Sequence, residues 1–209
     1  IDASRNRSGG AKAYLMGILS EVNPLDYGIK EVHIWAPDSL LNKLENYRWL
    51  IKHSSKELQQ SIIKQIWWQA TKLSYEAKSI GCDIMFTTDA STLCRFKPMI
   101  VLSQDMLSYE PGAMRRYGYT KQRIRLLAVL LIQNYPFRFS DGVIFLTQYA
   151  SKVIQRSTGL LTRVKCIPHG VGLNFRSLQF NHTWPNDSTE PIRCVYISNT
   201  EMYKHQWVV

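Results

Sequence analysis

The chain has 209 residues, of which 45% are hydrophobic and 20% charged, a mixture typical of a globular protein with one good core. Its formal net charge of +10 favours anionic partners such as nucleic acid, phosphate-bearing ligands or an acidic membrane surface. The longest apolar run of the basic region, residues 126–132, is far too short to span a bilayer. No two cysteines form a CxxC pair, which argues against a zinc site and a disulfide framework: Cys82, Cys94, Cys166 and Cys194.

The ends of the sequence suggest a piece of a longer protein. The chain begins at Ile1 without a methionine, within the pattern of a strand, and ends at "HQWVV" within the pattern of a helix. We expect a cytoplasmic protein, because scattered cysteines suit a reducing compartment, and a peripheral position at the inner membrane face if its basic region contacts lipid.

Short β-branched runs alternate with longer helical segments along the chain. The first strand ends in "IDA", a helix follows over 9–22, and Asp38 is placed to cap a helix over 39–47. The further predicted strands cover residues 31–37, 48–53, 82–88, 98–104, 142–147 and 163–168. This alternation predicts an α/β fold, a Rossmann-like doubly wound parallel sheet.

A long helix is predicted between the third and fourth strands. Ser54 or Ser55 begins it, it runs to about Ser79, and Gly81 supplies a C-terminal stop. One face repeats apolar residues at three- and four-residue spacing, which predicts a buried face: Leu58, Ile62, Ile66, Ala70 and Leu73. We expect Trp67 and Trp68 to be packing residues.

The segment 111–140 is basic and is expected to be helical over 111–134. It contains six arginine and lysine residues and no acidic residue. Three interpretations stay open: a solvated basic face, a contact with anionic lipid or a phosphorylated acceptor, and a nucleic-acid contact. Tyrosines in "RRYGYTK" at 115–121 are suited to stacking on bases, but no recognised nucleic-acid motif is present.

The character of the chain changes after Gly170. Residues 171–191 are polar, rich in Asn and Ser, and are predicted to be a linker. A strand over 192–199 and the start of a helix then follow. We therefore expect a first domain over 1–170 and the start of a second, truncated Rossmann-like domain over 192–209.

Ligands of an open α/β sheet bind at the carboxyl ends of its strands. The predicted loops there are 8–10, 87–92, 104–109, 147–151, 169–170 and, in the second domain, 198–204. Gly9 and Gly10 allow backbone N–H groups to approach a ligand, and the following helix N-terminus favours negative charge. Because neither GxGxxG nor GxxxxGK[ST] is present, the residues leave a simple turn and a phosphate site as alternatives.

Five segments, in order, give the chain a family resemblance. They are "RSGGAKAYL", "MIVLSQDMLSYEP", "GVIFLTQYASKVI", "VKCIPHGVGL" and "CVYISNTEMYKHQ". Their sequence and spacing over nearly the whole chain resemble the retaining, nucleotide-sugar-dependent glycosyltransferases of family four, which have the GT-B fold. The resemblance implies two Rossmann-like domains facing across a cleft, the first mainly for the acceptor and the second mainly for the donor.

The resemblance also implies partners and site residues. It implies a UDP- or GDP-sugar, a saccharide or lipid-linked acceptor, no metal and no further cofactor. Gly9 and Gly10 would approach the donor phosphates or the acceptor, and Lys204 would contact the diphosphate. Asn199 stands where the family carries arginine, and Gln104, beside Asp105, where many members carry histidine; these are the candidate donor-binding and catalytic positions. The expected cleft residues are Arg5, Ser8, Thr147, His169 and Gly170. We expect residues 1–209 alone to turn over little or nothing.

Two other functions fit the sequence. One is a non-catalytic basic α/β module that binds a protein partner or nucleic acid, the latter less favoured because no motif supports it. The other is a different enzyme for a phosphate-bearing ligand, such as an epimerase of similar fold.

Overall fold

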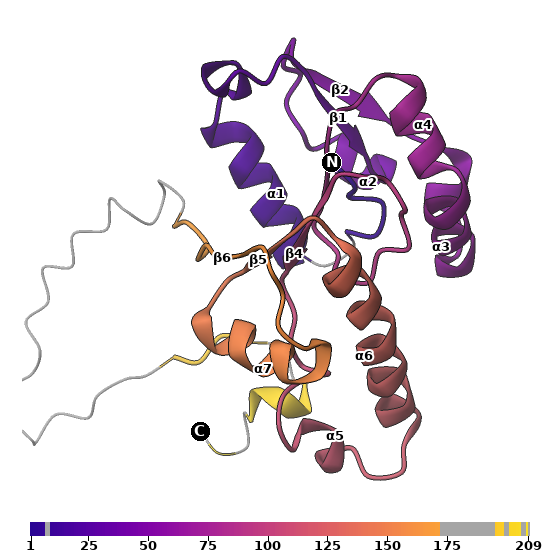
Figure 1. Cartoon of the computed structure of the whole chain (residues 1–209). Coiled ribbons are helices and arrows are strands. Elements are labelled where there is room, and N and C mark those ends of the chain that lie inside the picture. Colours follow the sequence, from indigo (N-terminus) through magenta and orange to yellow (C-terminus); the bar gives the residue numbers. More distant parts are fainter. Residues whose placement is uncertain (7–8, 172–194, 199–200, 206–207, 209) are drawn as a thin grey trace, which may run out of the picture. The chain divides into compact units, whose positions relative to one another are not determined.

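The computed structural model describes residues 1–6, 9–171, 195–198, 201–205 and 208 (Figure 1). The chain divides into two compact units, Ile1–His169 and Gly170–Val209. All the described strands belong to the first unit. None of the helices in the described ranges is long and apolar enough to cross a membrane.

Every strand pairing in the first unit is parallel. Strand β1 (Val32–Trp35) pairs with β2 (Leu50–His53), with Val32 opposite Leu50. A second group runs in the order β3 (Met85–Thr87), β4 (Met99–Ser103), β5 (Gly142–Phe145) and β6 (Val164–Cys166). Each of these six strands lies inside a predicted one, so the α/β fold with a parallel, Rossmann-like sheet is confirmed.

The first residues of the chain join the two groups of strands. Asp2 forms a parallel bridge to Trp35 on one side and to Thr87 on the other. The Asp2 N–H donates to the Phe86 carbonyl at 2.7 Å, and the Ala3 N–H donates to the Trp35 carbonyl at 2.9 Å. The chain therefore winds outward in both directions from Asp2, which makes this position the topological switch point of the sheet.

Helices lie on both faces of the sheet. The helices in chain order are α1 (Gly9–Glu21), α2 (Asp38–Leu41), α3 (Ile62–Thr71), α4 (Leu73–Ser79), α5 (Ala113–Arg116), α6 (Lys121–Phe139) and α7 (Gln148–Thr158). Short 3₁₀ turns are η1 (Pro24–Tyr27), η2 (Lys56–Gln59) and η3 (Met202–Lys204). Figure 1 shows α1 and the α3–α4 pair on opposite sides of β1.

Two buried clusters reflect this arrangement. Ile34 packs in one cluster with Leu15 and Leu19 of α1, whereas its neighbour Trp35 packs in the other with Trp68 of α3. Successive side chains of a strand point to opposite faces, so adjacent residues of β1 serve the two cores. The larger cluster continues over β3, β4 and β5 and includes residues of α6 and α7.

The helix predicted from Ser54 or Ser55 to Ser79 is divided. Residues 56–59 form the 3₁₀ turn η2, and Ser61, with extended backbone, begins α3. Lys72 then separates α3 from α4, although the Lys72 N–H still donates to the Trp68 carbonyl and the Glu76 N–H to the Lys72 carbonyl. The predicted stop is confirmed, because Gly81 has a φ of +79°.

The predicted buried face of this helix is confirmed at its two ends, where Leu58 and Leu73 are buried, and is wrong between them. Ile62 is 47% exposed, whereas α3 buries Gln65, Trp68 and Gln69. The inward face is rotated by one residue because the two glutamines donate to polar partners inside the molecule: Gln65 Nε2 bonds the Leu58 carbonyl at 2.6 Å. Trp68 is fully buried, but Trp67 is 54% exposed, so only one tryptophan is a core residue.

Two further predictions need correction. Asp38 is the first residue of α2 and not its cap; its carboxylate instead accepts from Ser54 Oγ at 2.5 Å. The helix begins after Pro37, whose backbone is extended, and lasts one turn; Leu44, beyond its end, is buried. In the second unit, the described residues 195–198 form no strand; the other residues of that predicted strand lie outside the described ranges.

Candidate functional site

Loops that follow the strand at Asp2 and strand β3 are joined at the switch point. The guanidinium of Arg5 lies 3.2 Å from the Asp89 carboxylate, atom Nε to atom Oδ2. Arg5 Nη1 also donates to the Ser91 carbonyl at 2.8 Å. Arg5, predicted to line a ligand cleft, is therefore held by protein partners, and it fixes the two loops against each other.

Burial and charge act in opposite directions on Asp89. Burial raises the pKa of this carboxyl, while Arg5 and the backbone N–H of Ser91 oppose that rise. The Ser91 N–H donates to Asp89 Oδ1 at 2.8 Å. The loop after β3 thus presents a carboxylate whose charge depends on its arginine partner.

A second bond joins the same loops one residue further on. Thr88 Oγ1 donates to Asn6 Oδ1 at 2.8 Å, and both side chains are buried. Asn6 is only 3% exposed, and its Nδ2 has no hydrogen-bond acceptor among the described residues. A buried amide nitrogen in that state lacks the hydrogen-bond partner that such groups normally have.

The start of α1 lies directly after this pair of loops. Gly9 and Gly10 are its first two residues, and a Cβ added to either would meet no atom within 4 Å. Packing within the protein does not require glycine at these positions. Glycine is compatible with a ligand that lies directly against the backbone, without a side chain between them. The first turn of α1 contains no acidic residue, so its N–H groups keep their full attraction for an anion.

The buried carboxylate of Asp2 holds together the elements around the candidate site. Asp2 is 1% exposed and accepts from Ser4 Oγ at 2.6 Å and from Gln69 Nε2 at 2.6 Å. Thr92 Oγ1 donates at 3.1 Å to Asp2 Oδ2, the same oxygen that accepts from Gln69. The Asp2 network connects the first strand, helix α3 and the loop after β3, and it holds the candidate site in shape.

The candidate catalytic residues Gln104 and Asp105 follow β4. Gln104 is partly buried, and its Nε2 has no acceptor among the described residues. Asp105 is exposed, and its carboxylate accepts from the Leu107 N–H at 2.9 Å. Gln104 therefore has a free donor, whereas Asp105 forms a local turn.

The remaining cleft candidates are placed separately. Thr147 is the N-cap of α7, where its hydroxyl accepts from the Ala150 N–H at 3.0 Å. His169 is exposed, and its ring lies edge-on to Tyr14 of α1, with 4.7 Å between ring centroids. The end of the first unit is thus brought to the same helix that begins with Gly9 and Gly10.

Several predicted residues lie elsewhere. Gly170 and Lys204 belong to the second unit, in which the Lys204 ammonium lies 5.0 Å from the Tyr203 ring centroid. The Lys204 carbonyl also accepts from Tyr196 Oη at 2.8 Å. Ser8 and Asn199 lie outside the described residues.

Comparisons with known proteins give no assignment. No protein-family model matches the chain, and searches of curated proteins and of solved structures find no match. The site is therefore argued from its geometry alone.

Neither a metal cluster nor a deep cavity marks the site. The described residues contain no group of three or more His, Cys, Asp or Glu side chains that would hold a metal ion.

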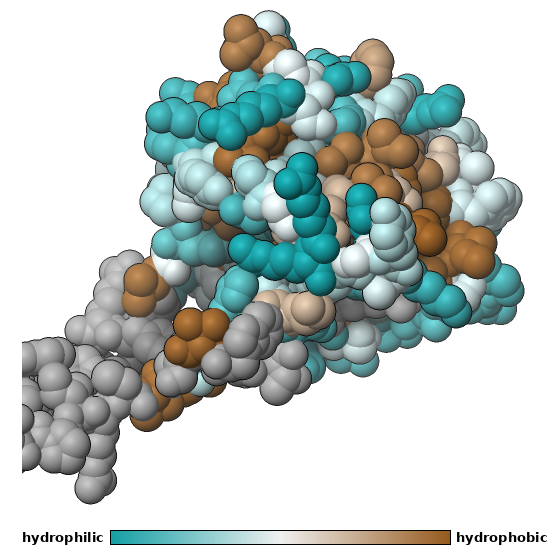
Figure 2. All heavy atoms as spheres, turned by 90° about the horizontal axis from the view of Figure 1, so that it is seen from below, coloured by the Kyte–Doolittle hydropathy of each residue, from teal (hydrophilic) through white to brown (hydrophobic). Residues whose placement is uncertain are grey.

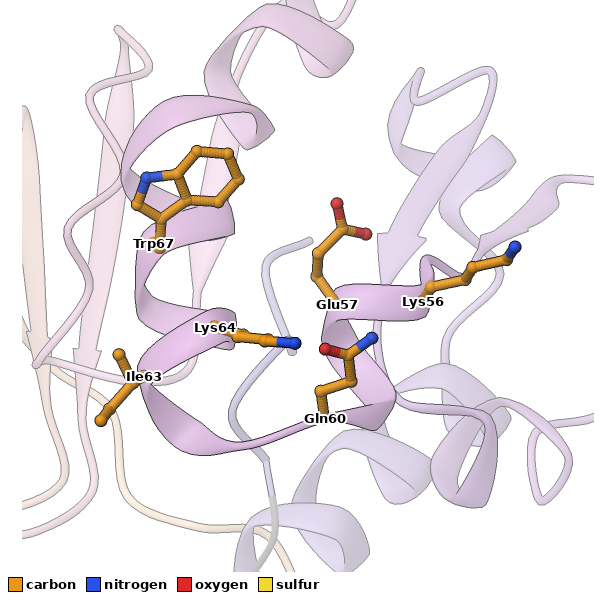
Figure 3. A pocket seen from close by; sticks show the side chains of 6 residues that line it. All are labelled: Lys56, Glu57, Gln60, Ile63, Lys64 and Trp67. Carbon is orange, nitrogen blue, oxygen red and sulfur yellow. The ribbon is translucent and has the colours of Figure 1, made fainter.

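A hollow of about 630 Å³ lies instead beside η2 and α3 (Figure 3). Figure 3 shows Lys64 extending from α3 toward Glu57 and Gln60, with the Trp67 ring above. Glu57 already has a partner in Lys72, at 2.5 Å.

Sequence reasoning missed most of the polar residues at the switch point. Asp89 and Thr88 were expected only as part of a loop, and Asp2 and Asn6 were not considered. A signal for Asp2 was present, because a charged residue inside a buried strand is rare unless it has partners. No pattern in the sequence links Asp2 to Gln69, which lies 67 residues later.

Proposed function

We propose that this chain forms the acceptor-side part of a retaining, nucleotide-sugar-dependent glycosyltransferase of the GT-B type. The observation that carries the proposal is the joining of two polar loops and a glycine-initiated helix at the switch point of a parallel sheet. Ligands with phosphate groups bind at this place in open α/β sheets.

The free donors suit a sugar phosphate. Asn6 Nδ2 and Gln104 Nε2 lack acceptors among the described residues. A side-chain amide donates a hydrogen bond to a sugar hydroxyl or a phosphate oxygen, but it does not act as an acid or a base at neutral pH. In the proposed reaction these residues bind and orient, while the α1 N-terminus meets developing negative charge on the diphosphate.

A glycine-to-alanine pair tests the proposal. Gly10→Ala adds a methyl group where no protein atom lies within 4 Å, so we expect folding to be retained. If a ligand lies against this backbone, its affinity falls about tenfold, since a displaced contact costs about 1.4 kcal/mol. The measurement is calorimetric titration of the 209-residue protein with UDP-glucose, GDP-mannose and inorganic pyrophosphate.

Gly17→Ala is the matched control, because Gly17 lies in the same helix and also has open space around it. We expect this control to raise stability by up to about 1 kcal/mol and to leave affinity unchanged. Equal affinities of the two variants for these ligands contradict the proposal. Salt-dependent binding of single-stranded oligonucleotides instead would favour the non-catalytic module.

A further inference from the structure

Helix α6 exposes a continuous apolar face. Six large side chains on it are between 41 and 69% exposed: Ile124, Leu127, Leu131, Ile132, Tyr135 and Phe139. They recur at intervals of three, four or one residue, so they share one side of the helix. We call these six residues the α6 stripe.

The opposite side of α6 already serves the core. Leu126, Gln133 and Phe137 are buried there, and Phe137 contacts the Tyr109 ring at 6.2 Å between centroids. The stripe is therefore an additional apolar surface that the core does not use. Figure 2 shows hydrophobic side chains gathered on the side of the molecule where α6 lies in Figure 1. Contiguous exposed apolar surface of this kind marks an interaction site.

Positive charge flanks the N-terminal end of the stripe. Lys121 and Arg125 lie in the first two turns of α6, whereas Arg138, in its last turn, donates to the Ser157 and Thr158 carbonyls. No acidic residue occurs from Pro111 to Ser140. Tyr119, just before the helix, is fully exposed, and the Arg123 guanidinium lies 5.4 Å from its ring centroid.

We propose that the α6 stripe docks on an anionic lipid bilayer, with the helix lying in the plane of the interface. Apolar side chains enter the boundary between headgroups and acyl chains, tyrosine and phenylalanine occupy the interface, and lysine and arginine meet anionic headgroups. The charge pattern distinguishes this occupant from others. A second copy of this surface offers no acidic residue between Pro111 and Ser140 to meet Lys121 and Arg125, whereas anionic headgroups do. Nucleic acid would leave the exposed isoleucine and leucine side chains without an apolar partner.

Vesicle co-sedimentation tests the docking surface. The probe is the 209-residue protein with vesicles of phosphatidylcholine alone or with about one third phosphatidylglycerol. We expect binding only to the anionic vesicles and its loss as salt is raised. Substituting Ile124→Ser and Leu131→Ser together removes two side chains that are each 69% exposed, and should lower partitioning about tenfold or more.

Matched variants separate the stripe from general hydrophobicity. Leu25→Ser with Ile29→Ser removes similarly exposed apolar groups near η1, and we expect partitioning to be unchanged. Lys121→Gln with Arg125→Gln should lower binding to anionic vesicles about tenfold, since each basic residue near the surface favours binding several-fold. Thermal unfolding monitored by circular dichroism checks that every variant is folded.

The proposal is overturned by binding that does not depend on phosphatidylglycerol, or by stripe variants that bind as the wild type does. It is equally overturned if the stripe variants abolish concentration-dependent dimerisation without changing vesicle binding, because the stripe would then pair two copies. The inference does not depend on the proposed glycosyltransferase activity, so a failure of one leaves the other standing.

Discussion

Arg5 and Asp89 show how a single ion pair shapes the candidate site. Their side chains are 17% and 23% exposed, so water screens the pair only in part. The pair joins residues 84 positions apart and holds the loop after β3 against the segment that leads into α1. The geometry of the candidate site therefore depends on a charge that faces the protein and not the ligand.

Removing the arginine should make stability depend on pH. Burial raises the pKa of Asp89, so its ionisation costs stability as pH rises through that pKa, and Arg5 offsets the cost. Arg5→Met should therefore destabilise the fold by about 2 kcal/mol at pH 7 and by clearly less near pH 4, where the folded carboxyl, with its raised pKa, takes up a proton and no longer needs a cationic partner. Urea unfolding at the two pH values measures this difference.

Lys72→Met provides the comparison for that experiment, because the Lys72–Glu57 pair is more exposed. Hydrogen bonding to Lys72 lowers the pKa of Glu57, so loss of the lysine should also cost more stability at pH 7 than at pH 4, but only weakly because this pair is exposed. If Arg5→Met loses equal stability at both pH values, the pair does not control Asp89.

At the scale of single residues, sequence located some of the site's loops but few of the contacts. The sequence predicts a helix over 9–22, and Gly9 and Gly10 begin α1. The assignment of Arg5 to a ligand missed its partner because Asp89 lies on a different strand's loop. A cross-strand pairing of this kind depends on sheet order, which local patterns do not contain.

At the scale of elements, the α3–α4 region shows where periodicity fails. The apolar pattern predicts that Ile62, Ile66 and Ala70 are buried. Gln69 is buried instead, because its amide donates to the Asp2 carboxylate and accepts from the Leu93 N–H. The strands were better predicted, since β-branched runs of four to seven residues between turn residues leave few alternatives.

The adjacent tryptophans of α3 give an element-scale prediction. Trp68 is fully buried, and Trp68→Ala should lower the free energy of unfolding by about 3–5 kcal/mol through loss of burial and a cavity. Trp67→Ala, at a position 54% exposed, should change it by less than about 0.5 kcal/mol. Chemical denaturation of the two variants makes the comparison; equal losses would show that the inward face has been assigned wrongly.

At the scale of the whole first unit, Asp2 ties the two groups of strands into one sheet. Asp2→Asn keeps the shape but places an amide N–H₂ among donors, including Gln69 Nε2 and the hydroxyls of Ser4 and Thr92. We expect a loss of about 2 kcal/mol, with a single cooperative transition.

The exposed Asp83→Asn is the control for this substitution and should leave stability within about 0.5 kcal/mol of the wild type. Two separated unfolding transitions in Asp2→Asn would contradict cooperative loss. Thermal melts followed by tryptophan fluorescence and by circular dichroism detect such a separation.

The bridge at Asp2 has a consequence for biosynthesis. Its partners Thr87 and Thr92 lie 85 and 90 positions later in the chain. At a translation rate of about 5–20 residues per second, the Asp2 segment waits roughly 5–20 s for the neighbours that complete it. During that interval the Asp2 segment lacks its β3 neighbour and has an unpaired strand edge on that side. A chaperone that shields this edge would therefore act on the nascent chain before β3 is made.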